Sequence, residues 1–144
     1  MNSLRMVVLV ILIILLAATV SAEVKGWGLG AGVFRGDFGV QARKDFWLGG
    51  DVSQITGQAS VYFHSNTTFR IDADYHFIIN PGTPSRLYPL AGLDFAFNSD
   101  AFRVGINGGV GVNFMITQSL AAFGEAKYVF GKWDGWAFTA GIYI

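Results

Sequence analysis

The sequence contains no cysteine and few charged residues. Because none of its 144 residues is a cysteine, disulfide scaffolds, cysteine-ligated zinc sites and thiol nucleophiles are excluded. Charged residues make up 14% of the chain, against about 25% in an average soluble domain, so a water-facing surface would be short of ions. Ten basic and ten acidic side chains leave no net charge, which removes the electrostatic case for a nucleic-acid partner.

The chain is instead rich in apolar residues and glycine, and its N-terminus explains part of that hydrophobicity. Hydrophobic residues make up 52% of the sequence, which also holds 19 glycines. Arg5 precedes an apolar run from Met6 to Val20, and the small residues Ser21 and Ala22 follow. A basic start, a short apolar run and a small-residue end predict a secretory signal peptide over residues 1–22. The run is shorter than the roughly 20 apolar residues that a membrane-spanning helix needs.

From Val24 onward, hydrophobic residues recur with a period of two, which is the period of a β-strand. Eight such segments can be marked, separated by turns rich in Gly, Asn, Asp and Ser: 24–34, 38–48, 54–63, 68–79, 86–97, 101–116, 119–130 and 135–144. Short turns between successive strands predict an antiparallel up-and-down arrangement, with a strand count between about seven and ten left open. Lys44 and Asp45 interrupt the second segment, which either carries a bulge there or ends early.

The polar face of these strands indicates where the inside lies. A closed barrel of eight strands can place its apolar face inside, as soluble lipid-binding barrels do, or outside against membrane lipid. Here the polar face is rich in Gly, Asn and Gln, whereas a soluble surface would be rich in Lys and Glu. Small residues suit the narrow interior of an eight-stranded barrel. The sequence therefore predicts an all-β fold, an eight-stranded antiparallel up-and-down transmembrane β-barrel over residues 23–144, after the signal peptide.

Eight charged side chains fall on the predicted lumenal positions. They are four cations and four anions: Arg43, Arg70, Arg103, Lys127, Asp72, Asp74, Asp94 and Glu125. Charges confined in a low-dielectric tube are tolerated only when they are paired and hydrogen-bonded, so we expect a structural polar network that fills the lumen. Asp72 and Asp74 share a face, as a pair of catalytic carboxylates would, but Arg70 beside them favours structural ion pairing.

Aromatic residues gather at one level of the apolar face. If the first strand runs outward from the periplasm, the outer ends of the hairpins carry nine of them: Phe38, Phe63, Phe69, Phe95, Phe97, Phe102, Tyr128, Phe130 and Trp136. A smaller group lies at the inner level: Trp27, Tyr75, Phe77 and Phe114. Such a level is the aromatic girdle expected at a membrane interface.

Three segments carry a resemblance to a known group: the signal peptide ending in Val-Ser-Ala, the stretch from Val104 to Phe130, and the closing strand WAFTAGIYI. The sequence resembles the small bacterial outer-membrane β-barrel proteins similar to the transmembrane domain of outer-membrane protein A. The resemblance covers the chain after the signal peptide and is a pattern, not a catalytic signature. It implies export through the inner membrane, localisation in the outer membrane, and two partners, outer-membrane lipid and the barrel-assembly machinery. Chains of this group usually end in an aromatic residue, whereas this sequence ends in Ile144 after Tyr143.

Histidine and serine residues offer little for catalysis or metal binding. His64 and Ser65, with Glu125 elsewhere, suggest the triad of lipid A deacylases, but adjacent residues of a strand face opposite ways. His64 and His76 lie near opposite ends of a hairpin, so we interpret both as polar fillers of the lumen and not as zinc ligands. The sequence thus predicts no catalytic residue, no metal site and no cofactor.

The function favoured by the sequence is that of a non-enzymatic integral outer-membrane barrel, with a structural role in the envelope or a narrow porin-like pore. The outer turns are short, which argues against a large adhesion platform, because binding usually resides in long loops. Two alternatives stay open. One is a secreted soluble lipocalin-like barrel that binds a lipophile, and the other, less favoured, is an outer-membrane enzyme that modifies lipid A.

Overall fold

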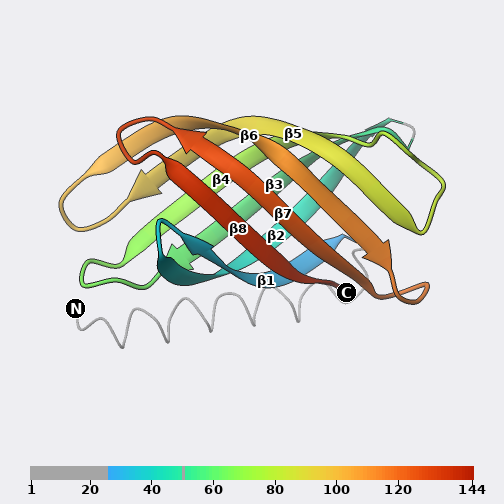
Figure 1. Cartoon of the computed structure of the whole chain (residues 1–144), viewed down its shortest axis with the longest axis horizontal. Coiled ribbons are helices and arrows are strands. Elements are labelled where there is room, and N and C mark those ends of the chain that lie inside the picture. The colour runs from blue at the N-terminus through green and yellow to red at the C-terminus, as the bar shows by residue number, and fades with distance from the viewer. Residues whose placement is uncertain (1–25, 50) are drawn as a thin grey trace.

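Eight antiparallel strands close on themselves in the computed structural model, which describes residues 26–49 and 51–144 (Figure 1). The strands are β1 (Trp27–Phe34), β2 (Asp37–Gly49), β3 (Ser53–Tyr62), β4 (Thr68–Phe77), β5 (Ser85–Phe97), β6 (Phe102–Met115), β7 (Ala121–Phe130) and β8 (Gly135–Tyr143). Each strand pairs with the next in sequence, and β1 also pairs with β8, where Gly28 lies opposite Tyr143. The predicted eight-stranded up-and-down β-barrel is confirmed.

The two ends of the barrel carry different turns. We call the end with the turns at 35–36, 63–67, 98–101 and 131–134 the girdle end; it lies on the left in Figure 1. The opposite end, which we call the terminal end, holds the C-terminus and the turns at 78–84 and 116–120. The predicted signal peptide, residues 1–22, lies outside the described residues. Among the residues that are described, no helix has the length and apolar character needed to cross a membrane.

The β1–β2 hairpin illustrates how local sequence closes the strands. Phe34 lies opposite Asp37, so only two residues form the turn. Both have positive φ angles, 55° at Arg35 and 90° at Gly36. Two positive φ angles define a type I′ turn, whose backbone twist matches the right-handed twist of the paired strands. The turn therefore sets the register of β1 against β2.

β2 continues through Lys44 and Asp45, where the sequence allowed a bulge or an early end. The irregularity in its pairing with β3 lies further along, between Trp47 and Gly49. Lys44 Nζ lies 5.3 Å from the ring centroid of Trp27, while Asp45 accepts a hydrogen bond from a side chain of β3. Both charged side chains therefore contact neighbouring strands, and β2 continues past them without a break.

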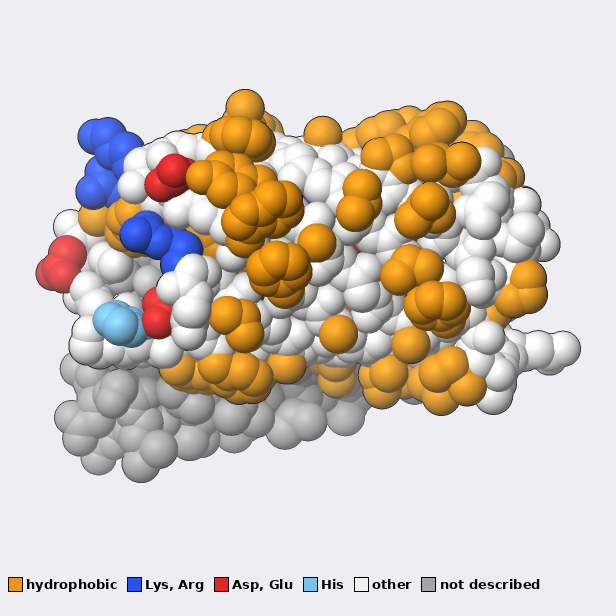
Figure 2. Space-filling model, in the orientation of Figure 1, with side chains coloured by type: hydrophobic (Ala, Val, Ile, Leu, Met, Phe, Trp, Pro, Cys, Tyr) orange, Lys and Arg blue, Asp and Glu red, His pale blue; other side chains and the backbone are white. Residues whose placement is uncertain are grey.

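Burial alternates along the strands and identifies the inside. In β4 the buried set is Arg70, Asp72, Asp74 and His76, and the exposed set is Ile71, Ala73, Tyr75 and Phe77. Large apolar side chains cover the outer wall; Phe102, for example, is 62% exposed. In Figure 2 they spread along the barrel, whereas exposed charged side chains gather on its left, at the girdle end. An apolar outside around a polar inside suits a barrel surrounded by lipid.

Candidate functional site

The candidate site is the polar network that fills the lumen, and its central tie joins β2 to β7. Arg43 Nη2 donates a hydrogen bond to Glu125 Oε1 at 2.8 Å, and Nη1 donates to Oε2. β2 and β7 are not neighbours in the barrel, so this ion pair spans the lumen. Arg43 also donates to the amide oxygen of Gln58, and the Tyr88 hydroxyl donates to Glu125 Oε2 at 2.8 Å. Side chains from four strands, β2, β3, β5 and β7, therefore take part in these hydrogen bonds.

Two further ties lie beside it. Lys127 Nζ, on β7, donates to Asp74 Oδ2 at 2.8 Å and lies 3.5 Å from Asp72 Oδ2, both on β4. Arg70 Nε donates to Asp94 Oδ2 at 2.9 Å between the neighbouring strands β4 and β5. All five side chains are buried. Since β4 and β7 do not pair, Lys127 makes a second bridge across the lumen.

Buried aromatic rings pack on the two guanidinium groups. The guanidinium carbon of Arg70 lies 3.8 Å from the ring centroid of Phe34, and that of Arg43 lies 4.1 Å from the centroid of Phe123. A guanidinium group is weakly hydrated and stacks well on an aromatic face. The rings therefore stabilise the cations where carboxylates do not reach them.

Glycines on the wall give these side chains room. A Cβ atom at Gly111 would lie 2.4 Å from the Tyr88 ring, and one at Gly92 would lie 2.2 Å from Asp74 Oδ1. Both distances are far inside van der Waals contact. The glycines on the predicted polar face therefore let a narrow barrel enclose large charged side chains.

The structure brings together seven of the eight charged side chains that the sequence placed in the lumen, and Arg103 is the exception. Arg103 is half-buried at the girdle end, with its guanidinium carbon 5.5 Å from the ring centroid of Trp133. It forms no ion pair with any described residue, so its assignment to the charge-paired network is wrong. The reason is that alternation sets the face of a residue but not its depth, and Arg103 is the second residue of β6. Among the described residues, the buried set is therefore four acids against three bases, not four against four.

Sequence reasoning left several side chains of the network out of the site. They include Gln58, Thr56, Tyr88, Tyr143 and Asp45. The Tyr143 hydroxyl accepts from Arg43 Nη1 at 3.4 Å and donates to Asp45 Oδ1 at 3.2 Å. Thr56 Oγ1 donates to the same Asp45 oxygen at 2.7 Å. The alternation held the signal, because Asp45 lies two residues after Arg43 and so faces the same way.

The nine aromatic residues predicted for the outer girdle all lie at the girdle end, and each packs against another of the nine. The ring pairs, with the distances between centroids, are Phe38–Phe63 at 6.5 Å, Phe69–Phe97 at 5.6 Å, Phe95–Phe102 at 6.4 Å, Tyr128–Phe130 at 4.8 Å and Tyr128–Trp136 at 5.4 Å. At the terminal end, Phe46 and Trp47 are also exposed and extend the smaller predicted group. Aromatic rings thus lie at both ends of the apolar wall.

Comparison with known proteins bears on the fold. No protein-family model and no curated protein matches the sequence. The barrel is similar to the N-terminal β-barrel domain of OprF from Pseudomonas aeruginosa, with 20% identity, a TM-score of 0.64, and coverage of 81% of this chain and 92% of that one. It is also similar to Neisserial surface protein A, with 16% identity, a TM-score of 0.59, and coverage of 82% and 92%. The fold is that of the outer-membrane β-barrels.

A designed transmembrane β-barrel is similar as well, at 14% identity and a TM-score of 0.60, with coverage of 81% of this chain and 90% of the designed one. The resemblance inferred from the sequence is confirmed at the level of the fold, and the expected outer-membrane localisation agrees with it. A soluble lipocalin-like barrel does not agree with this structure, because the barrel has its charges inside and its large apolar side chains outside.

The residues considered for a deacylase triad are far from forming one in this outer-membrane barrel. His64 and Ser65 are exposed in the β3–β4 turn, and Glu125 is buried in the lumen against Arg43. His64 Nδ1 instead lies 2.8 Å from Asp37 Oδ1, with its side chain 62% exposed. The prediction that His64 fills the lumen is therefore wrong, because His64 lies in a turn beyond the end of β3 and outside the alternation.

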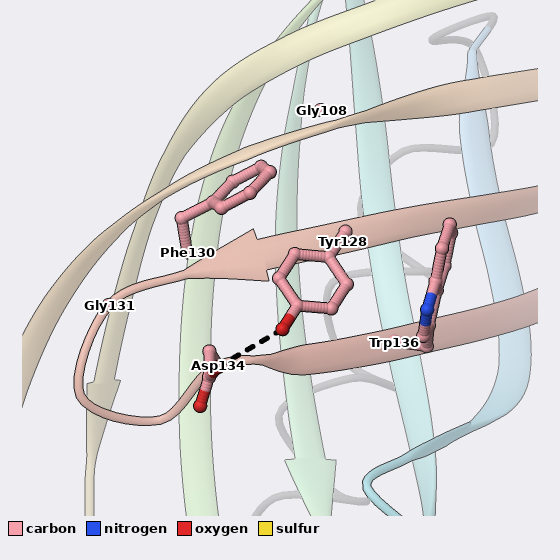
Figure 3. Close-up of a pocket in the computed structure, with 6 residues that line it drawn as sticks. All are labelled: Gly108, Tyr128, Phe130, Gly131, Asp134 and Trp136. Carbon is pink, nitrogen blue, oxygen red and sulfur yellow. Dashed lines mark hydrogen bonds between the residues drawn. The ribbon is translucent and has the colours of Figure 1, made fainter.

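A shallow hollow of about 670 Å³ lies on the outer wall of the barrel at the girdle end (Figure 3). Its lining residues are Gly108, Tyr128, Phe130, Gly131, Asp134 and Trp136. The Tyr128 hydroxyl donates to Asp134 Oδ2 at 3.0 Å, and the rings of Phe130 and Trp136 stand on either side of Tyr128. Three of the lining residues belong to the aromatic girdle, so this hollow lies on the apolar outer wall and is separate from the lumen.

Proposed function

We propose that this protein is a non-enzymatic integral barrel of the bacterial outer membrane, whose closed, ion-paired lumen gives it a structural role in the envelope. In this proposal residues 1–22 direct export and are removed, the barrel-assembly machinery inserts residues 23–144, and the girdle end faces outward. The apolar wall, with rings at both ends, supports contact with outer-membrane lipid.

The observation that carries the proposal is the Arg43–Glu125 pair. Its two side chains are 0% and 1% exposed and reach each other from strands on different sides of the lumen. Lys127 makes a second bridge from β7 to β4, and the ring of Phe123 covers Arg43. A water-filled pore would leave such groups solvated, whereas these are buried on all sides. This burial supports a closed barrel over the alternative of a narrow porin-like pore.

The places of His64, Ser65 and Glu125 in the described barrel favour a role without the deacylase triad. His64 and Ser65 belong to an exposed turn, while Glu125 already binds two donors in the lumen. A nucleophile, its base and the acid that orients the base need to lie within hydrogen-bond reach of one another. If the protein acts on lipid A after all, a Ser65→Ala variant loses that activity, and unchanged activity removes this candidate.

Membrane insertion is tested by electrophoresis of the extracted membrane fraction with and without boiling. A folded outer-membrane barrel resists the detergent until it is boiled, so we expect the band to change its apparent size. Recovery in the soluble periplasmic fraction, with no change on boiling, would overturn the proposal. N-terminal sequencing of the purified protein checks the leader, and we expect the chain to begin at Glu23.

Closure is tested by ion conductance across a planar lipid bilayer. We expect the wild-type barrel to show no resolved conductance steps. The double variant Arg43→Ala with Glu125→Ala, which removes the central tie, should admit ions, and His64→Ala, in an exposed turn, should behave as the wild type does. Regular conductance steps from the wild type, unchanged in the double variant, would favour a narrow pore.

A further inference from the structure

The fully buried part of the lumen holds one more acid than it holds bases. Among the described residues, the buried acids are Asp72, Asp74, Asp94 and Glu125, and the buried bases are Arg43, Arg70 and Lys127. Among the half-buried side chains on the same face, Asp45 is matched by Arg86 and Arg103. Unpaired charge in a low-dielectric interior is costly unless a counter-charge compensates it. The buried carboxylates therefore offer oxygen atoms that a cation can bind.

One cluster in the lumen has the composition of a metal site. Asp74 and His76 lie two residues apart on β4 and face the lumen together, and Glu125 reaches them from β7. One ligand atom from each of the three lies within 4.8 Å of the others. Asp74 and His76 are 0% exposed and Glu125 is 6% exposed. Nitrogen and oxygen ligands of zinc lie about 2.0–2.2 Å from the ion, so the three side chains would draw slightly closer together around it.

Two atoms of this cluster lack a hydrogen-bond partner although they are fully buried. They are Asp74 Oδ1 and His76 Nε2. The other oxygen of Asp74 accepts from Lys127, so Oδ1 is the atom with free lone pairs. Glu125 binds Arg43 and Tyr88, but a carboxylate offers about four lone-pair sites and keeps room for a metal. Other buried atoms also lack a partner, such as the side-chain atoms of Gln41 and Asn107, but these two belong to a cluster of metal-ligating groups.

Gln54 and Tyr88 hold His76 in the orientation that a metal ligand requires. The side-chain amide of Gln54 lies 3.0 Å from His76 Nδ1, and Gln54 Oε1 has no partner. Turning the amide over lets Nδ1–H donate to Oε1, which places the free lone pair of the ring on Nε2. A metal-bound histidine almost always donates its second N–H in this way. The Tyr88 ring stacks on the imidazole with centroids 4.4 Å apart and fixes its plane.

We propose that Asp74, His76 and Glu125 bind one divalent transition-metal cation of the zinc class in the lumen. Imidazole nitrogen together with carboxylate oxygen is a ligand set typical of Zn²⁺, and a water molecule completes its four-fold coordination. Lys127 remains on the other oxygen of Asp74, and Arg43 remains on both oxygens of Glu125, where they orient the ligands.

The test measures zinc in barrel purified in detergent from cells grown with added Zn²⁺, since a buried cluster is best filled while the chain folds. We expect about one zinc per barrel after dialysis, by elemental analysis. Asp74→Asn and His76→Gln, which keep size and polarity, should lose the zinc. Gln54→Ala should weaken its binding by about 10–100-fold. His64→Ala removes the only other histidine in the sequence and should leave the zinc content unchanged.

The folded state of each variant is checked by its band shift on boiling. Replacement of zinc by Co²⁺ supplies a second measurement, because four-coordinate cobalt with His76 as a ligand absorbs visible light and His76→Gln abolishes the absorption. Wild-type barrel without zinc or cobalt refutes the proposal. Zinc retained by folded Asp74→Asn and His76→Gln, or lost in His64→Ala, refutes it as well. Neither result bears on whether the lumen conducts ions.

Discussion

Replacing Glu125 with alanine would leave the Arg43 guanidinium charged and without its carboxylate in the lumen. The two side chains are 0% and 1% exposed, and Arg43 donates to both carboxylate oxygens. Removing one partner of a buried ion pair costs about 3–5 kcal/mol, because the other charge stays uncompensated. Tyr88 also loses the shorter of its two hydrogen bonds and keeps the one to Asn113 Oδ1 at 3.3 Å, so the further loss is at most about 1 kcal/mol. We therefore expect Glu125→Ala to lower the free energy of unfolding by about 4 kcal/mol or more.

The assay is reversible urea unfolding of the barrel in lipid vesicles, followed by tryptophan fluorescence. The matched control is Arg43→Met combined with Glu125→Leu, which replaces the pair by apolar side chains of similar length. That double variant needs no charge compensation, so it should be more stable than either single variant. The reasoning fails if Glu125→Ala costs less than about 1 kcal/mol, as an exposed pair would, or if the double variant loses the sum of the two single losses.

Three further substitutions probe the wall, the packing of the lumen and the exposed turns. Val110, in the middle of β6, is 55% exposed, and Val110→Arg should cost about 2–4 kcal/mol in vesicles while Val110→Leu stays near the wild type; equal stability of the two would show that this wall does not face lipid. Gly111→Ala places a methyl group 2.4 Å from the Tyr88 ring, so overpacking should cost about 1–3 kcal/mol by the same assay, and no loss would mean that the lumen has spare room. His64→Ala removes only an exposed contact with Asp37 and should change stability by less than about 1 kcal/mol, whereas a larger loss would place His64 in the packed interior.

The strands were predictable because their signals are local. Thr68–Phe77, for example, alternates apolar and polar residues, and the polar set is buried. The turn at Arg35 and Gly36 was predictable for the same reason, because glycine adopts the positive φ angle that such a turn requires. Even the choice between a soluble and a membrane orientation followed from which residue types occupy each face.

Depth along the barrel axis was not predictable by the same means. Arg103 and His64 both lie next to turns at the girdle end, where one contacts Trp133 and the other Asp37. Alternation along a strand shows which side of the sheet a residue faces. It does not show whether the residue lies deep in the lumen or at its mouth, where side chains contact the turns. The balanced set of four cations and four anions therefore became three buried bases and four buried acids.

The sequence by itself determined the alternating strands, the apolar outside and the pool of charges inside, because each depends on residues that are close in the chain. The count of eight was the preferred reading of the sequence, and the closed barrel settled it. The pairing of those charges depended on the closed barrel. Arg43 and Glu125 are 82 positions apart, and they meet only because the pairing of β1 with β8 closes the sheet into a narrow tube. The same closure brings Glu125 against Asp74 and His76. Which strands face each other across a lumen depends on the register of every pair around the ring, and no local pattern encodes that sum.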